Sequence, residues 1–127
     1  MYKRGRKGSF YRDVDDFHRK FLLGYAGRPR MLREDIMGAR YDHLYEEVAE
    51  LLKGICEKDK EQVLDALVDI VYVALGTSNL MGFDFELAWD RVHAANMKKV
   101  RMKTSRSPID IVKPIGWEKP LLKDLCE

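Results

Sequence analysis

The sequence has no long apolar run, only two cysteines and little net charge. No apolar run approaches the roughly 20 residues of a membrane span, and no signal-peptide core follows the basic start, so no membrane association is expected. Cys56 and Cys126 lie far apart without a metal-binding spacing, and a reduced cytoplasmic protein is the simplest interpretation. Lys and Arg (23) nearly balance Asp and Glu (21), which disfavours a dedicated nucleic-acid surface.

The length of 127 residues is typical of one domain, and an apolar share of 46% is sufficient for a core. Residues 1–12 contain a cluster of Lys and Arg and are interpreted as a solvated basic tail. Residues 106–127 show no helical period but are richer in apolar residues than a disordered tail. We therefore expect residues 13–105 to form the domain, and residues 106–127 to dock on it or on a partner subunit.

Apolar residues at helical spacing predict four helices, at about residues 13–23, 32–53, 60–81 and 85–102. Gly54 stands where a C-cap is expected after the second helix. Asp59 followed by Gln62 resembles a capping box at the start of the third helix, which should stop at Gly82. Asp84 can cap the fourth. Because no segment shows convincing strand alternation, the expected fold class is all-α.

Two aspartates lie in the most apolar of these helices. Asp65 and Asp69 are four residues apart, so they share one face of a helix that is apolar nearly all round and should be central and buried. Like charges at this spacing repel, and an unpaired buried carboxylate is strongly unfavourable. A cation should therefore face them, either a Lys or Arg from a neighbour or a metal ion.

The second helix carries a matching acidic flank. Spacings of three and four residues place four polar side chains on one side of it: His43, Glu46, Glu47 and Glu50. Such a flank alone is usually solvated, but helices joined by a short connection tend to pack antiparallel, so the two acidic patches can meet. Hard oxygen donors without cysteine predict a site for Mg²⁺ or Mn²⁺.

Four segments in the expected order resemble the MazG-like all-α nucleoside triphosphate pyrophosphohydrolases, the superfamily of MazG and phosphoribosyl-ATP pyrophosphohydrolase. Residues 46–50 (EEVAE) resemble its EExxE signature, and residues 65–73 (DALVDIVYV) its second acidic helix. Residues 93–99 (HAANMKK) are similar to its third signature, and residues 16–21 (DFHRKF) to the start of some members. The likeness covers roughly residues 13–122. It departs from the ExxD pattern of the second acidic helix at Ala66, where Asp65 must substitute for the glutamate.

The resemblance implies a four-helix bundle-like MazG-type fold, assembled as a homodimer or homotetramer. It also implies hydrolysis of nucleoside triphosphates to monophosphate and pyrophosphate, in nucleotide-pool control or sanitation. Magnesium, or manganese, held by Glu47, Glu50, Asp69 and Asp65 would neutralise the triphosphate while water attacks the α-phosphorus. Glu46 is the candidate general base, and Glu47 is the alternative.

Four further residues are candidates for binding the nucleotide. The Asn96 amide could bind the sugar or base and the Lys99 ammonium a phosphate, although both also suit a polar helix end. Trp117 could stack on the base or simply pack the C-terminal segment. His93 is a candidate as well, although such a histidine is more often packed or solvated.

Two other classes of function compete with this interpretation. Carboxylate-bridged di-iron bundles repeat Glu-x-x-His on two helices, whereas only His43-x-x-Glu46, in reverse order, and Asp90-x-x-His93 come near that motif here. A non-catalytic helical module that binds nucleotides or nucleic acid is the main alternative. Several nucleoside triphosphates remain possible substrates.

Overall fold

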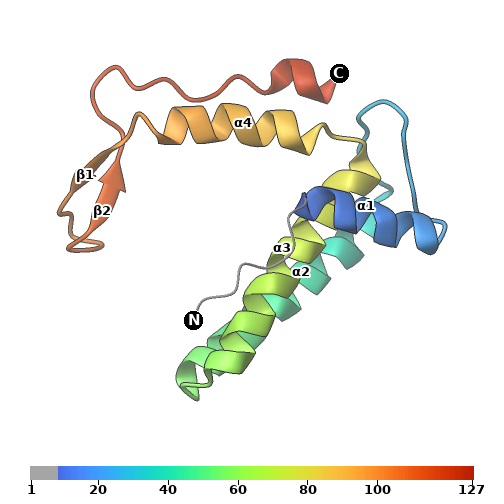
Figure 1. Ribbon diagram of the computed structural model, residues 1–127, viewed down its shortest axis with the longest axis horizontal. Coiled ribbons are helices and arrows are strands. Elements are labelled where there is room, and N and C mark those ends of the chain that lie inside the picture. The colour runs from blue at the N-terminus through green and yellow to red at the C-terminus, as the bar shows by residue number, and fades with distance from the viewer. Residues whose placement is uncertain (1–8) are drawn as a thin grey trace. The chain divides into compact units, whose positions relative to one another are not determined.

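The computed structural model describes residues 9–127 and divides the chain into two compact units, with the boundary between Phe83 and Asp84. The first unit contains α1 (Phe10–Lys20), α2 (Glu34–Cys56) and α3 (Lys60–Met81) (Figure 1). The second contains α4 (Phe85–Asn96), β1 (Val100–Met102), β2 (Asp110–Val112) and the 3-10 helix η1 (Lys123–Cys126). The described chain is therefore mostly helical, as expected, but the expectation that it has no strands is wrong.

α2 and α3 form an antiparallel hairpin connected by residues 57–59. Gln62, near the start of α3, donates a hydrogen bond to Glu50, near the end of α2. Arg40, in the first half of α2, instead contacts Val73 and Thr77 in the second half of α3. Contacts that run in opposite directions along the two helices fix the antiparallel arrangement, which brings the acidic segments of both helices to the same part of the hairpin.

The ends of α3 lie where the sequence predicts them. The Asp59 carboxylate accepts hydrogen bonds from the backbone N–H groups of Glu61 (3.1 Å) and Gln62 (3.2 Å). Gly82 ends the helix in the left-handed conformation, with φ of 76°, which a residue without Cβ adopts readily. The Gln62 side chain, expected to complete the capping box, instead donates to Glu50 Oε2 at 2.9 Å.

The second helix extends further than predicted, and Gly54 is not its C-cap. Gly54 is buried inside α2, which continues to Cys56. Two backbone bonds explain the extension: the Glu57 N–H donates to the Lys53 carbonyl and the Asp59 N–H to the Gly54 carbonyl, both at 2.9 Å. The glycine therefore lies in the packed end of the hairpin instead of stopping the helix.

α1 begins at Phe10, three residues before the predicted start, because Ser9 caps it. The Ser9 hydroxyl accepts a hydrogen bond from the Arg12 N–H at 3.3 Å. Val14 and His18 form the buried face of α1, which packs on α3. Residues 1–8 of the predicted basic tail lie outside the described residues.

Only part of α3 is buried within the described chain, although its nearly continuous apolar pattern predicts a central, buried helix. Within the first unit, α1 and α2 cover two sides of it. Apolar side chains on the remaining side expose 46–63% of their surface: Leu64, Leu67, Val68 and Val71. Within residues 9–127, no other element covers this apolar side of α3.

Among the described residues, α3 is also the one helix long and apolar enough to cross a membrane by length and composition. The inspection of apolar runs did not predict this because Asp65 and Asp69 interrupt the run. A core helix of a soluble protein meets the same criteria, and the two carboxylates lie within the segment that would have to be in lipid.

In the second unit, α4 ends at Asn96, six residues before the predicted end, and the chain forms a β-hairpin. The Asp84 carboxylate caps α4, as predicted, by accepting from the Leu87 N–H at 3.1 Å. β1 and β2 pair antiparallel, with Val100 opposite Val112. Strands of three residues are too short to show alternation in the sequence, which is why they were missed.

Two hydrogen-bonded contacts attach the C-terminal segment to α4 within the second unit. The Trp117 Nε1–H donates to the Ala95 carbonyl at 2.7 Å. The Arg91 guanidinium forms a bidentate pair with Asp124, at 2.7 and 3.0 Å, and also donates to the Leu121 carbonyl at 2.9 Å. Residues beyond the hairpin are thus attached to α4 by specific polar contacts, whereas Ile115 and Leu121 are exposed.

Candidate active site

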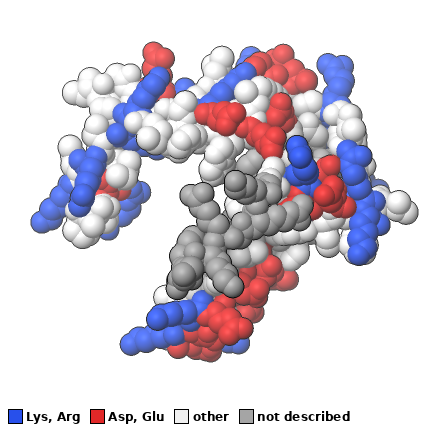
Figure 2. Space-filling model, viewed as in Figure 1, with Lys and Arg blue, Asp and Glu red and all other residues white. Residues whose placement is uncertain are grey.

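An acidic hollow of about 880 Å³ lies on the α2–α3 hairpin. Six carboxylates line it: Glu47, Glu50, Asp59, Glu61, Asp65 and Asp69. All four predicted metal ligands are in this set, and Figure 2 shows acidic side chains on the visible face of the hairpin. The antiparallel packing explains their meeting, since Glu47 and Glu50 are one turn apart on α2 while Asp65 and Asp69 are one turn apart on α3.

The described lining of the acidic hollow offers no basic side chain to offset this charge. None of the described residues that line the hollow is basic, and within residues 9–127 neither Asp65 nor Asp69 forms an ion pair. Glu50 accepts a hydrogen bond from the neutral Gln62 amide. At the edge, His43 Nε2 lies 3.4 Å from Glu47 Oε1. Repulsion among six carboxylates therefore favours the binding of cations in the hollow.

The donor set fits a hard divalent cation by its chemistry. Carboxylate oxygens without thiolate are the ligands that Mg²⁺ and Mn²⁺ prefer. Within the described part of the chain, however, no three His, Cys, Asp or Glu side chains are close enough together to hold one ion. The carboxylates thus share a hollow without forming a closed cage, as suits a cation bound through a few carboxylates and the oxygens of a substrate.

Two positions of the predicted acidic motifs differ from the rest. Glu46, the candidate general base, is exposed and lines neither this hollow nor the one described next. Ala66, which occupies the glutamate position of the family's ExxD pattern, lines the hollow although it is only 2% exposed. Asp65 precedes it and is exposed at the same hollow, so its carboxylate is available where the expected glutamate is missing.

A second, smaller hollow of about 320 Å³ adjoins the acidic one, because Glu47 and Asp69 line both. Its other lining residues are aromatic, basic or apolar: Phe17, His18, Arg40, His43, Tyr72 and Val73. Phe17 and Tyr72 meet edge to face, with ring centroids 5.3 Å apart. Sequence reasoning missed Arg40 as a site residue, and included His18 and Tyr72 only within the resemblance of residues 16–21 and 65–73.

His18, which lines the second hollow, belongs to a polar cluster between α1 and α3. His18 Nδ1 lies 2.9 Å from the Asn79 side-chain oxygen, and the Asn79 amide donates to Asp15 at 2.9 Å and to the Tyr11 hydroxyl at 3.2 Å. Burial lowers the pKa of His18, with the Arg40 charge acting in the same direction. The hydrogen bond with Asn79 acts in the opposite direction but does not outweigh burial, so the surroundings favour the neutral imidazole.

Gly76 is the point on α3 where Arg40 and His18 come together. A Cβ at this position would lie 2.8 Å from Arg40 Nη2 and 2.9 Å from His18 Nε2, closer than real Cβ atoms approach. The glycine therefore creates the space through which a side chain of α2 and a side chain of α1 reach the same wall.

The four predicted nucleotide-binding residues all belong to the second unit. Asn96 is the exposed last residue of α4, and His93 is exposed one turn earlier. Lys99 and Trp117 are brought together, with the ammonium 5.2 Å from the ring centroid, and Lys113 lies 5.0 Å from the same ring. Basic side chains also gather on the β1–β2 hairpin (Figure 2).

The comparisons with known proteins agree with the acidic pattern. The sequence profile of the phosphoribosyl-ATP pyrophosphohydrolase family matches residues 14–96, which is more than half of the chain. The match includes every carboxylate of the acidic hollow and ends at Asn96, before Lys99 and Trp117. Comparison with curated proteins gives no match. The resemblance predicted from the motifs is confirmed: the chain belongs to the phosphoribosyl-ATP pyrophosphohydrolase family, whose activity is the hydrolysis of an acid anhydride.

Proposed function

We propose that the protein is a magnesium-dependent nucleoside triphosphate pyrophosphohydrolase that produces a nucleoside monophosphate and pyrophosphate. One observation carries the proposal: a family member concentrates six carboxylates in one hollow whose described lining contains no basic residue. A salt bridge from a neighbouring helix, the competing explanation for Asp65 and Asp69, has no support within residues 9–127. A divalent cation together with a polyphosphate is the ligand that fits such a hollow.

Glu47, Glu50, Asp65 and Asp69 would hold Mg²⁺, or Mn²⁺, in this proposal. The bound metal supplies neutralisation of the phosphate charge. The carboxylates would hold the cation, and this neutralisation lets the anionic triphosphate lie in the hollow. In the proposed reaction a water oxygen attacks the α-phosphorus, the bond from that phosphorus to the bridging oxygen breaks, and pyrophosphate leaves with the electron pair. The proton released by the water passes to a glutamate carboxylate.

Glu46 and Glu47 remain the two candidates for that general base. Glu47 faces both hollows, and its side chain is only 18% exposed. Glu46 lies one residue away, outside the lining. If Glu46 is the general base, Glu47 serves only as a metal ligand. If Glu47 is the general base, it has to bind metal as well.

The second unit is proposed to contribute substrate contacts. Asn96 would bind the sugar or base, Lys99 a phosphate, and His93 and Trp117 would complete the set. The ring of Trp117 has lysine ammonium groups near it, which is an arrangement that can accept an anionic nucleotide.

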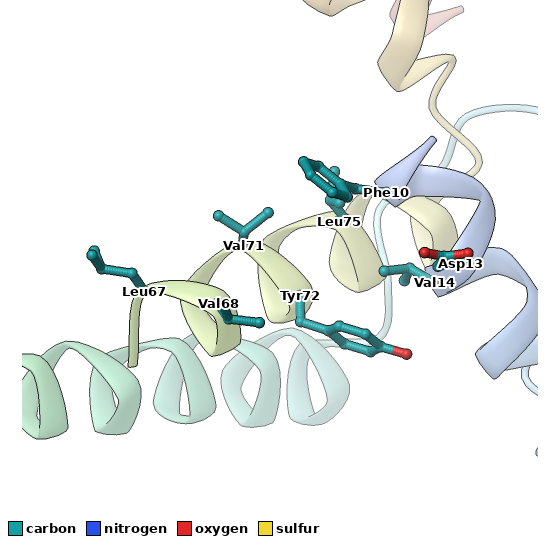
Figure 3. A pocket seen from close by; sticks show the side chains of 8 residues that line it. All are labelled: Phe10, Asp13, Val14, Leu67, Val68, Val71, Tyr72 and Leu75. Atoms are coloured by element: carbon teal, nitrogen blue, oxygen red, sulfur yellow. The ribbon is translucent and has the colours of Figure 1, made fainter. Parts of the chain in front are cut away.

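We also propose that the enzyme is a homodimer or homotetramer that acts in the cytoplasm in nucleotide-pool control. An apolar groove of about 420 Å³ runs along the open side of α3 and the adjoining end of α1 (Figure 3). Figure 3 shows Leu67, Val71 and Leu75 projecting from the same side of α3, with Phe10 of α1 beside Leu75. An exposed apolar surface of this kind is typical of an interface. Sedimentation should give a dimer or larger species at micromolar concentration, and a fully active monomer would exclude this assembly.

A substrate screen tests the activity itself. The full-length protein is incubated with Mg²⁺ and a panel of ribo- and deoxyribonucleoside triphosphates, and pyrophosphate and monophosphate are measured. We expect equal amounts of both products from at least one substrate, and none in EDTA. Release of orthophosphate in place of pyrophosphate, or no turnover of any triphosphate, would refute the proposed reaction.

A further inference from the structure

The second hollow has a composition unlike that of the acidic one and lies directly beside it. The two share Glu47 and Asp69, so a ligand whose phosphates lie at the carboxylates extends naturally into the second hollow. Its volume of about 320 Å³ is at the small end of the range for ligand pockets, about 300–1,000 Å³. Aromatic rings and imidazoles in its wall suit a flat heterocycle better than a phosphate group.

Arg40 is held in the wall of this hollow by neutral partners. Its Nε–H donates to Thr77 Oγ1 at 3.0 Å and its Nη2 to the Val73 carbonyl at 2.9 Å. Within residues 9–127 no carboxylate forms an ion pair with it, although the side chain is half-buried. Burial lowers the pKa of the guanidinium, because it removes water from around the charge.

The guanidinium keeps unused donors in a fixed position. It has five N–H groups, of which the two bonds to Thr77 and Val73 use two. Arg40 Nη2 also lies directly against Gly76 of α3, at 2.8 Å from where a Cβ would stand, which restricts the orientation of the guanidinium further. An arginine held in place by such bonds presents only hydrogen-bond donors, so it can bind acceptor atoms but not an amino group.

We infer that the second hollow binds the base of the substrate and that Arg40 determines specificity by donating to a carbonyl oxygen of that base. This inference rests on the proposed function, and it identifies the substrate class. Guanine, uracil, thymine and cytosine carry a carbonyl oxygen, which has two lone pairs for a forked guanidinium. The acceptors of adenine are single ring nitrogens, and its amino group, a donor, lies beside N1 and N7 and opposes a second N–H of the fork. The enzyme should therefore select nucleoside triphosphates with a carbonyl-bearing base over those with adenine.

Binding of non-hydrolysable substrates tests the inference independently of turnover. Calorimetry is carried out with the full-length protein, Mg²⁺ and the α,β-imido analogues of dUTP, dGTP, dCTP and dATP. We expect at least one of the three carbonyl-bearing analogues to bind roughly 10- to 100-fold more tightly than the dATP analogue, the factor of one well-placed arginine–base contact. Tightest binding of the dATP analogue, equal binding of all four, or no binding of any would overturn the inference.

Two Arg40 variants and a matched control separate base recognition from charge and from folding. Arg40→Gln should remove the preference by weakening the carbonyl-bearing analogues while leaving the dATP analogue nearly unchanged. Arg40→Lys keeps the charge but loses the planar fork, so it should lose most of the preference as well. Arg30→Gln is the control, since Arg30 also donates to a backbone carbonyl of α3, that of Leu80 at 3.2 Å, but lines neither hollow.

The results distinguish this inference from the proposed function. Arg40→Gln could lose affinity equally for all four analogues while Arg40→Lys binds them as tightly as wild type. That result would show that Arg40 contacts phosphate and would overturn the inference. Base preference in binding without any turnover would support the inference and refute the enzymatic reaction. If Arg40→Gln does not fold, the wild-type preference and the Arg40→Lys variant still decide the matter.

Discussion

Replacement of Asp69 by asparagine should have opposite effects on stability with and without metal. Asp69 lies in a hollow with five other carboxylates, and Asp65 is one turn away on the same helix. Like charges at this spacing destabilise a helix by about 0.2–0.5 kcal/mol. In EDTA, the neutral side chain of the same shape should therefore raise the free energy of unfolding by about that amount, which corresponds to a Tm increase of about 1–3 °C.

When Mg²⁺ is present, wild type should become the more stable of the two proteins. At ten times its dissociation constant, a ligand that binds only the folded state stabilises it by about 1.4 kcal/mol, or about 5 °C for a protein of this size. Wild type should gain this increment and Asp69→Asn should lose most of it. Turnover should fall by about 100-fold or more, because the variant loses several kcal/mol of charge stabilisation in the transition state.

The assay is thermal unfolding of both proteins in EDTA and in a Mg²⁺ series, with pyrophosphate release measured on the same preparations. Asp90→Asn is the matched control, because Asp90 is an exposed helical aspartate outside the hollow. It should behave like wild type in both conditions. A full Mg²⁺-dependent Tm increase in Asp69→Asn, or unchanged turnover, would refute the assignment of Asp69 as a metal ligand.

Three further predictions follow from other parts of the site. Glu46→Gln should lower kcat and leave the Mg²⁺-dependent Tm increase intact, whereas Glu47→Gln should reduce both. If Glu47→Gln lowers kcat alone and Glu46→Gln reduces both, Glu47 is the base and is excluded as a metal ligand. The Arg106 guanidinium and then the Thr104 hydroxyl hold the pKa of Asp110 at about 2, below its ordinary 3.8. Because the folded pKa is the lower one, the ionised carboxylate stabilises the β1–β2 hairpin above pH 3.8 and this contribution is lost as the pH falls through about 2. Asp110→Asn should therefore reduce the hydrogen-exchange protection of β1 and β2 at pH 7, with a smaller difference as the pH approaches 2, and a pH-independent difference would contradict this. Trp117→Ala should lower Tm, because it removes the hydrogen bond to the Ala95 carbonyl. If Trp117 also holds the base, KM should rise by a factor equivalent to ~1–3 kcal/mol with little change in kcat, and an unchanged KM would leave Trp117 with a packing role alone.

The boundaries of α3 could be predicted because local residues decide them. Asp59 satisfies the first N–H groups of the helix, and Gly82 adopts the left-handed conformation that ends it. The end of α4 is decided differently. β1 pairs with β2 across a turn that depends on bonds from Arg106 and Thr104 to Asp110. The helical period that continues through residues 97–102 gives no sign of this competing pairing, so the sequence predicts too long a helix.

The two hollows also differ in how far local sequence patterns predict them. Glu47, Glu50, Asp65 and Asp69 were predicted together because helical spacing fixes their sides and a short connection makes the helices antiparallel. The wall formed by His18 and Arg40 has no such periodic signal. It depends on α1 and α2 meeting over the missing side chain of Gly76, and a glycine inside an apolar helix indicates close packing without naming the partners.

The partial burial of α3 within one chain has a physical explanation in the arrangement of the helix itself. Asp65 and Asp69 are offset by two residues from Leu67 and Val71, which places the acidic and apolar pairs on nearly opposite sides of a helix with 3.6 residues per turn. The spacing of apolar residues along a helix is the same whether its own chain or a second copy of the chain covers them, so the sequence alone does not distinguish the two cases. Within the described chain the Leu67 and Val71 side is open, with 46% and 48% of each residue exposed. If a second copy covers it, as proposed, assembly would rigidify the helix that carries Asp65 and Asp69. A Val71→Glu variant would then lose both the dimer and the Mg²⁺-dependent Tm increase, whereas a monomeric variant that keeps the full increase would show that the metal site is independent of assembly.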